Sequence, residues 1–246
     1  KGRDWKYRNG KIVLSKRTAI PYFTQKELFF KEKKGGVSME SNIPEHYILF
    51  SEGGLLQSKQ LAVTYIKEKE SNWQGKTPVY AVKQLPNTIA KLKEGKSLSI
   101  VFYGNSIEAG ANSSITLNQP PYLPTWPEMT ILNLRDHYSG SIQFKNKSKG
   151  GMLAKWGLEN ASDLINSEKP DLVVIGFGMN DGSSKVAPDL FLDQIKGIIQ
   201  TIEISNPTCE FIVIATMLAN PLAIQSQIQK VYHQPVLSLE RSGVAI

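Results

Sequence analysis

Cysteine and histidine are scarce in this sequence, and long apolar runs are missing. The 246 residues include one cysteine, Cys209, and three histidines. A single cysteine excludes an internal disulfide and leaves no Cys-x-x-Cys or Cys/His pattern for zinc. No run approaches the roughly 18 apolar residues of a membrane span, and no signal peptide opens the chain. The sequence therefore predicts neither a disulfide miniprotein nor a membrane-spanning protein, and it carries no cofactor or metal motif.

The composition is that of a globular chain with an excess of basic residues. Hydrophobic residues make up 41% and charged residues 21%, and 29 basic against 22 acidic residues give a net charge of +7. Such an excess suits an anionic partner. The basic residues are spread out, however, and the densest run (31–34) contains an acid and precedes the turn Gly35-Gly36. We interpret this run as a solvated loop and predict no nucleic-acid partner.

The chain changes character near residue 95. Before it, short β-rich runs alternate with turn signals, which predicts a small all-β, sandwich-like module with a linker at its end, over residues 1–94. These runs cover residues 11–14, 27–30, 46–50 and 61–65. The segment 85–95 is expected to be the linker.

After residue 95, apolar strands alternate with amphipathic helices, which predicts a parallel sheet covered by helices on both faces. The expected strands cover 97–103, 142–145, 171–177, 210–216 and 243–246, and the expected helices begin at Thr125 and cover 188–203 and 222–241, the last kinked at Pro235. We therefore predict an α/β domain over residues 95–246.

Polar and glycine-rich turns follow three of these strands. They are Gly104-Asn105-Ser106, the segment 146–151, and Gly178-Met179-Asn180-Asp181. Ligands of parallel sheets bind beyond the carboxyl ends of the strands. A small-residue turn there can expose a serine hydroxyl, and backbone N–H groups or a side-chain amide can bind a developing oxyanion. The order of the turns, each after its own strand, predicts a nucleophile with three oxyanion donors.

In these three blocks the sequence resembles the SGNH (GDSL-like) hydrolases, over residues 97–246. The resemblance implies a three-layer, flavodoxin-like fold and serine-dependent ester hydrolysis. It implies that Ser106 is the nucleophile, and that the backbone N–H groups of Ser106 and Gly151 and the amide of Asn180 form the oxyanion hole. A β-rich module joined to such a domain is similar to the layout of bacterial carbohydrate esterases.

The sequence departs from the family pattern in two places. Asn105 stands where the family usually has aspartate, which keeps the hydrogen-bonding shape but removes the charge. No Asp-x-x-His occurs in the 246 residues, and a serine without a base is a poor nucleophile. The chain also opens on Lys1 rather than Met. We expect a trimmed piece whose catalytic Asp and His follow residue 246, and which as printed is nearly inactive. His46, His137 and His233 are interpreted as structural.

The expected substrate is an acetyl ester on a polysaccharide or oligosaccharide. The alternatives are a lipid or thioester acyl hydrolase of the same family and a glycan-binding protein without catalysis on this scaffold. Tyr122, Trp126 and Trp156 flank the blocks and could stack on sugar rings, although packing of large apolar side chains explains each of them as well. Because a polysaccharide esterase acts outside the cytoplasm, we expect a secreted or periplasmic protein.

Overall fold

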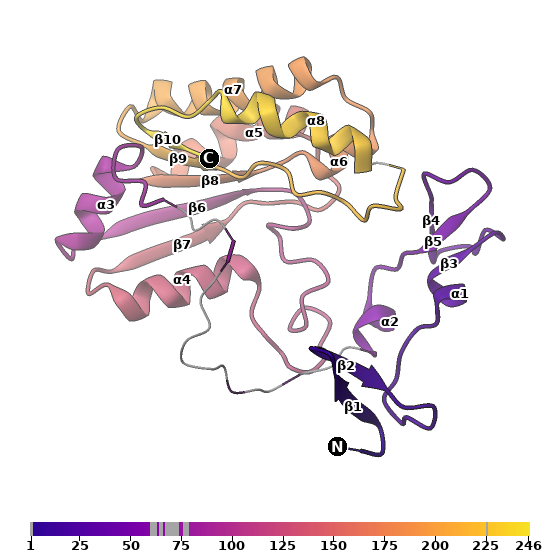
Figure 1. The fold of residues 1–246 in the computed structure, drawn as a ribbon. Coiled ribbons are helices and arrows are strands. Elements are labelled where there is room, and N and C mark those ends of the chain that lie inside the picture. Colours follow the sequence, from indigo (N-terminus) through magenta and orange to yellow (C-terminus); the bar gives the residue numbers. More distant parts are fainter. Residues whose placement is uncertain (1, 60–62, 64–65, 67–73, 76–78, 225) are drawn as a thin grey trace. The chain divides into compact units, whose positions relative to one another are not determined.

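The computed structural model describes residues 2–59, 63, 66, 74, 75, 79–224 and 226–246. Contacts between residues divide the chain into two compact units, Lys1–Lys67 and Glu68–Ile246. Figure 1 draws both units, and each is described by itself. None of the described helices combines the length and the apolar character that a bilayer crossing needs.

The first unit holds two small antiparallel sheets. Strands β1 (Trp5–Arg8) and β2 (Lys11–Leu14) form a hairpin, and β3 (Phe29–Phe30), β5 (Tyr47–Leu49) and β4 (Ser38–Glu40) form a sheet in that order. Two short helices, α1 (Gln25–Leu28) and α2 (Gly54–Gln57), complete it. Among the described residues of this unit, Ile48 is the one fully buried apolar side chain. The described part therefore lacks the thick apolar core that a β-sandwich shares between its sheets.

The prediction of a strand over residues 27–30 is wrong for its first half. Residues 27–30 were expected to be extended, but Glu27 and Leu28 belong to α1 and only β3 is extended. The reason is a capping box: the Thr24 hydroxyl accepts from the Glu27 N–H, and the Glu27 carboxylate accepts from the Thr24 N–H at 2.7 Å. This arrangement satisfies the free donors of a helix start. The strand expected over 61–65 lies mostly outside the described residues.

The second unit is built on a five-stranded parallel sheet, as predicted. Its order is β10-β9-β8-β6-β7. The strands are β6 (Leu98–Gly104), β7 (Ile142–Asn146), β8 (Leu172–Gly176), β9 (Glu210–Val213) and β10 (Val244–Ala245). The first strand along the chain, β6, pairs with β7 on one side. The later strands β8, β9 and β10 then add to the sheet one after another on the other side of β6. The order therefore reverses between β6 and β8, the position where open α/β sheets bind ligands.

Helices cover both faces of this sheet, which makes three layers (Figure 1). On one face lie α5 (Ala154–Ile165), α7 (Pro188–Ser205) and α8 (Ser226–Leu237), and on the other lie α3 (Pro86–Lys93) and α4 (Trp126–His137). A 3-10 turn, η1 (Asn166–Glu168), follows α5, and the short helix α6 (Met179–Ser183) follows β8. The capping box predicted at Thr125 and the Pro235 inside α8 are both present.

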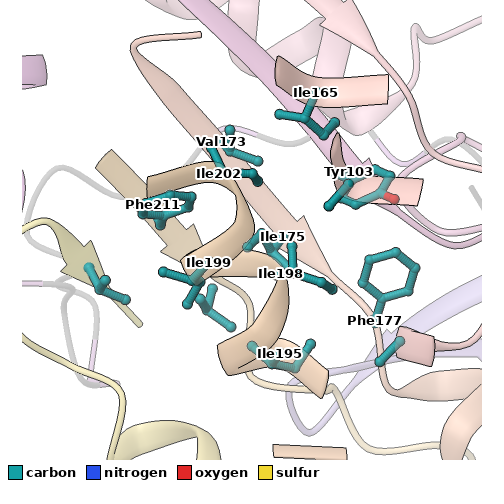
Figure 2. Packing of buried hydrophobic residues seen from close by; sticks show 14 of the residues in the cluster. Tyr103, Ile165, Val173, Ile175, Phe177, Ile195, Ile198, Ile199, Ile202 and Phe211 are labelled. Atoms are coloured by element: carbon teal, nitrogen blue, oxygen red, sulfur yellow. The ribbon is translucent and has the colours of Figure 1, made fainter. Parts of the chain in front are cut away.

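Successive residues of the strands point alternately into two apolar layers, one on each face of the sheet. Val101 and Tyr103 of β6 face α5 and α7, whereas Ile100 and Phe102 pack with α3 and α4. Figure 2 shows the larger cluster, in which the apolar stripe of α7 lies against β8 and β9. The residues predicted for this stripe are all buried: Phe191, Ile195, Ile198, Ile199 and Ile202.

The segment expected to be a linker is partly helical and packs with the sheet. Leu85 and Ile89 are buried in the layer on the α3 side. The Glu210 carboxylate, at the start of β9, accepts the N–H groups of Asn87 and Thr88, each at 2.7 Å. A carboxylate distant in sequence therefore satisfies the first turn of α3, and no local capping residue signals this helix.

Strand β7 forms one edge of the sheet, and two lysines lie at its end: Lys145 within the strand and Lys147 just after it. The Nζ atoms of Lys145 and Lys147 lie 2.6 and 2.7 Å from the carboxylate oxygens of Glu168, beyond α5. These two cations hold the pKa of the Glu168 carboxyl below its usual value. One face of β7 packs on α4, with Ile142 buried.

Candidate active site

The serine turn begins where β6 ends. Asn105 is buried, and its side-chain oxygen accepts the Ile107 N–H at 3.0 Å. Its own N–H donates to the carbonyl of Gly176 on β8 and to the Glu108 carboxylate, at 3.3 and 3.0 Å. These bonds fix the turn against the end of β8, and Ser106 lies partly exposed at the carboxyl edge of the sheet.

The second block runs beside this turn. The Lys149 N–H donates to the Gly104 carbonyl at 3.0 Å, which continues the β7 pairing past the strand end. A β-carbon built on Gly150 would lie 3.8 Å from the Ser106 Cβ. Gly151 follows with a φ of 78°, a conformation that favours glycine. The backbone of the second block is therefore in van der Waals reach of Ser106.

The third block is tied to the second. The Asn180 amide donates to the Met152 carbonyl at 3.0 Å. The buried Asp181 carboxylate accepts from the Ala154 N–H at 3.0 Å and from the Gly178 N–H at 3.1 Å. One carboxylate therefore joins the start of α6 to the start of α5. Burial raises the pKa of Asp181, and the backbone donors partly oppose this.

The three predicted oxyanion donors belong to turns at the carboxyl edge of the parallel sheet. Within the described part of the chain, the backbone N–H groups of Ser106 and Gly151 have no hydrogen-bond acceptor. The Asn180 amide uses one hydrogen on Met152, and an amide NH₂ carries two. Two unpaired backbone donors and one side-chain donor suit a charge that develops on a bound carbonyl oxygen.

Glu108 lies beneath the serine turn and is not among the site residues predicted from the sequence. It is 3% exposed. Burial raises the pKa of its carboxyl to about 7, against the lowering effect of its own N–H and that of Asn105. Its backbone carbonyl also accepts the Asn146 amide at 2.7 Å. Glu108 therefore connects the first block to the second.

Two of the three histidines lie on α4 and α8, and the third belongs to the first unit. Trp126, at the start of α4, donates through Nε1 to the Ile107 carbonyl at 3.0 Å. His137 ends the same helix, roughly 17 Å further on at 1.5 Å per residue. His233 is exposed on α8, and His46 of the first unit stacks on Phe29 with ring centroids 4.7 Å apart. Among the described residues of the second unit, neither His137 nor His233 is hydrogen-bonded to Ser106.

The aromatic residues near the blocks differ in accessibility. Trp126 packs edge-on against Phe102 at 5.1 Å, and half-buried Trp156 packs against Tyr103 at 5.8 Å. Both therefore contribute to packing. Tyr122 is 52% exposed on the loop that follows the serine turn. Among the described residues, no group of three or more His, Cys, Asp or Glu side chains could hold a metal ion.

The comparisons with known proteins find likeness in structure only. No family model matches the sequence, and neither does any curated protein. A two-domain esterase (CEX) active on acetylated mannans superimposes with a TM-score of 0.51 and 18% identity, over 67% of this chain and 41% of that one. The same esterase co-crystallised with mannopentaose superimposes with a TM-score of 0.51 and 19% identity, over 66% of this chain and 41% of that one. This chain thus spans less than half of that esterase.

A further solved structure is AlinE4, an SGNH-hydrolase family esterase. It superimposes with a TM-score of 0.47 and 20% identity, over 61% of this chain and 76% of that one. At such identities the likeness concerns the fold.

The strand order, the helices on both faces and the three blocks at the strand ends agree with the resemblance found in the sequence. The second unit has a three-layer α/β fold similar to that of the two-domain esterase.

Proposed function

We propose that the protein is a serine-dependent ester hydrolase and that Ser106 is its nucleophile. The observation that carries the proposal is the meeting of three blocks at the carboxyl edge of the sheet. They bring together the partly exposed Ser106, the N–H groups of Ser106 and Gly151, which have no acceptor among the described residues, and the Asn180 amide. The position between β6 and β8, where the strand order reverses, supports it.

The proposed reaction passes through an acyl-enzyme. The Ser106 oxygen attacks the ester carbonyl, and the oxyanion of the tetrahedral intermediate accepts from Ser106, Gly151 and Asn180. Collapse of this intermediate expels the alcohol and leaves the acyl group on Ser106, and water then releases the acid. The reaction also needs a base that takes the proton of the Ser106 hydroxyl and returns it to the leaving alcohol. No described hydrogen bond of Ser106 identifies that base.

We propose an acetyl group on a polysaccharide or oligosaccharide as the substrate. Support comes from the printed activity of the matched esterase, which acts on acetylated mannans. The exposed Tyr122 ring, on the loop after the serine turn, offers a face for a sugar. An extracellular or periplasmic location belongs to this proposal, because such polymers lie outside the cytoplasm.

Hydrolysis by the full-length protein tests the proposal. Acetate release from acetylated mannan, and phenol release from aryl esters of rising acyl chain length, are measured for the unmodified protein and for Ser106→Ala. We expect release that depends on Ser106 and falls sharply beyond short acyl groups. Equal rates for long acyl chains would favour a lipid or thioester hydrolase. Tight polysaccharide binding without cleavage would favour a glycan-binding protein.

The oxyanion donors have a separate test. Asn180→Ala removes one donor, so we expect kcat to fall about 100-fold or more. Asn160→Ala is the matched control, because this amide donates to the Trp156 carbonyl within α5. Its kcat should be unchanged. An Asn180→Ala protein with the original kcat would remove Asn180 from the proposed oxyanion hole.

A further inference from the structure

Two glycines face each other where the strand order reverses. Gly104 of β6 and Gly176 of β8 are register partners at the ends of their strands. A β-carbon on Gly104 would lie 2.5 Å from Glu108 Oε2, and one on Gly176 would lie 2.2 Å from Glu108 Oε1. No real β-carbon shows such distances, so both positions must be glycine for the carboxylate to lie there. The strand ends therefore accommodate the Glu108 side chain.

The Glu108 carboxylate occupies this space without a cation. No lysine, arginine or histidine of the described residues forms an ion pair with it. Its Oε2 accepts the backbone N–H of Asn105, the residue directly before Ser106. A buried charge costs free energy unless polar groups compensate for it. The Asn105 N–H is one of the polar groups that compensate for the charge of Glu108.

We propose that Glu108 is the positioning residue of the serine turn: its ionised carboxylate binds the Asn105 N–H across the Gly104–Gly176 pair and sets the direction of Ser106. This inference rests on the proposed function of Ser106. Asn105 carries no charge, so Glu108 supplies the negative group of the turn from three residues further along the chain.

The surroundings make this group responsive to pH. The titratable and charged side chains on the neighbouring elements are directed elsewhere. Asp181 binds Gly178 and Ala154, Tyr103 donates to the Gly157 carbonyl, Lys147 pairs with Glu168, and Lys149 lies over the Trp156 ring. Burial alone raises the pKa of Glu108, to about 7. Protonation would weaken the Asn105 contact near neutral pH, because a neutral carboxyl is a poorer acceptor.

Kinetics of the full-length protein give the first test. Glu108→Gln keeps the shape and removes the charge. We expect kcat for an acetyl ester at pH 8 to fall about tenfold through misdirection of Ser106, with KM unchanged. The decline of the unmodified kcat between pH 8 and 6 should also become shallower. Glu210→Gln is the matched control, because this buried carboxylate also accepts backbone N–H groups but lies at the opposite edge of the sheet. Its kcat should be unchanged.

A measurement without substrate decides the inference separately. The amide resonance of Asn105, followed by NMR from pH 5 to 9, should move with a midpoint near 7 and should stay fixed in Glu108→Gln. A pH-independent Asn105 amide, or a Glu108→Gln protein with the original kcat, would overturn the positioning role. If the amide titrates but no Ser106-dependent hydrolysis occurs, the contact stands and the proposed function fails.

Discussion

Asn105 lacks the charge that the family resemblance implies at its position, yet its turn contains a carboxylate. Glu108 provides that group beneath the turn, with Oε2 on the Asn105 N–H. Its charge is costly in this buried place, and polar backbone groups alone offset it. At the scale of single residues, the candidate site therefore depends on Gly104 and Gly176, which leave space for the Glu108 carboxylate, as well as on the groups that react.

Gly178 is another position where a small residue is required, so its substitution should destabilise the fold. Its φ is 122°, and a β-carbon would lie 1.9 Å from the Thr216 hydroxyl oxygen. Gly178→Ala should lower the free energy of unfolding by about 3 kcal/mol, from strain and collision together. Gly243→Ala is the control, since its φ is 85° but the nearest atom is 3.6 Å away. It should cost about 1 kcal/mol. Urea unfolding measures both, and equal losses would exclude the collision.

The sequence places Ser106, Gly151 and Asn180 after strands, and the fold brings their turns to one edge. This much was predictable, because parallel strands end together. Glu108 was not found, because its sequence signal is only a charged residue among small and apolar neighbours. The packing of that carboxylate against Gly104 and Gly176 depends on the register of β6 with β8, which local sequence does not specify.

At the scale of elements, the apolar stripe of α7 holds one layer to the sheet. Ile198 is fully buried between α5 and the strands, whereas Ile204 on the same helix is 83% exposed. Ile198→Ala should lower the free energy of unfolding by about 2–5 kcal/mol, through lost burial and a cavity. Ile204→Ala should change it by less than about 0.5 kcal/mol. Thermal or urea unfolding distinguishes them, and a similar small loss for both would contradict this packing.

Strands β6, β8, β9 and β10 of the second unit were predictable because each is a compact apolar run. Strand β7 gives a weaker signal, because Ile142 and Phe144 alternate with polar residues. Helix α7 was predictable because of its bulky stripe. Helix α5 was missed for the opposite reason. Its buried positions are Ala154, Gly157, Ala161 and Ile165, mostly small residues that let it approach its neighbours. A β-carbon on Gly157 would lie 2.7 Å from the Phe177 ring. The apolar residues of α5 recur at the helical period all the same, but the buried ones are mostly small and form no bulky stripe.

For the second unit as a whole, buried carboxyls predict how stability depends on pH. Glu108 has a folded-state pKa near 7 against a model-peptide value of 4.5, and the pKa of Asp181 is also raised. Between these values the folded chain retains protons that the unfolded chain releases, so stability falls as pH rises. We expect the free energy of unfolding to be lower at pH 8 than at pH 5.5, by on the order of 2 kcal/mol.

Denaturant unfolding at the two pH values checks this dependence. Glu108→Gln removes one of the groups, so its dependence on pH should be clearly weaker than that of the unmodified protein. An unchanged dependence would mean that Glu108 titrates alike in the folded and unfolded chains. The same charge that positions Ser106 is thus expected to lower stability above neutral pH.

Strand β7 leaves one row of backbone groups at the sheet edge without a strand partner in the described sheet. Such an edge is a template on which another chain can add a strand and start an aggregate. Lys145 and Lys147, held by Glu168, place two ammonium groups beside it. A second copy would have to bring its own lysines close to these cations. These charges are therefore expected to oppose the addition of a strand at this edge, and the effect should weaken as salt screens them.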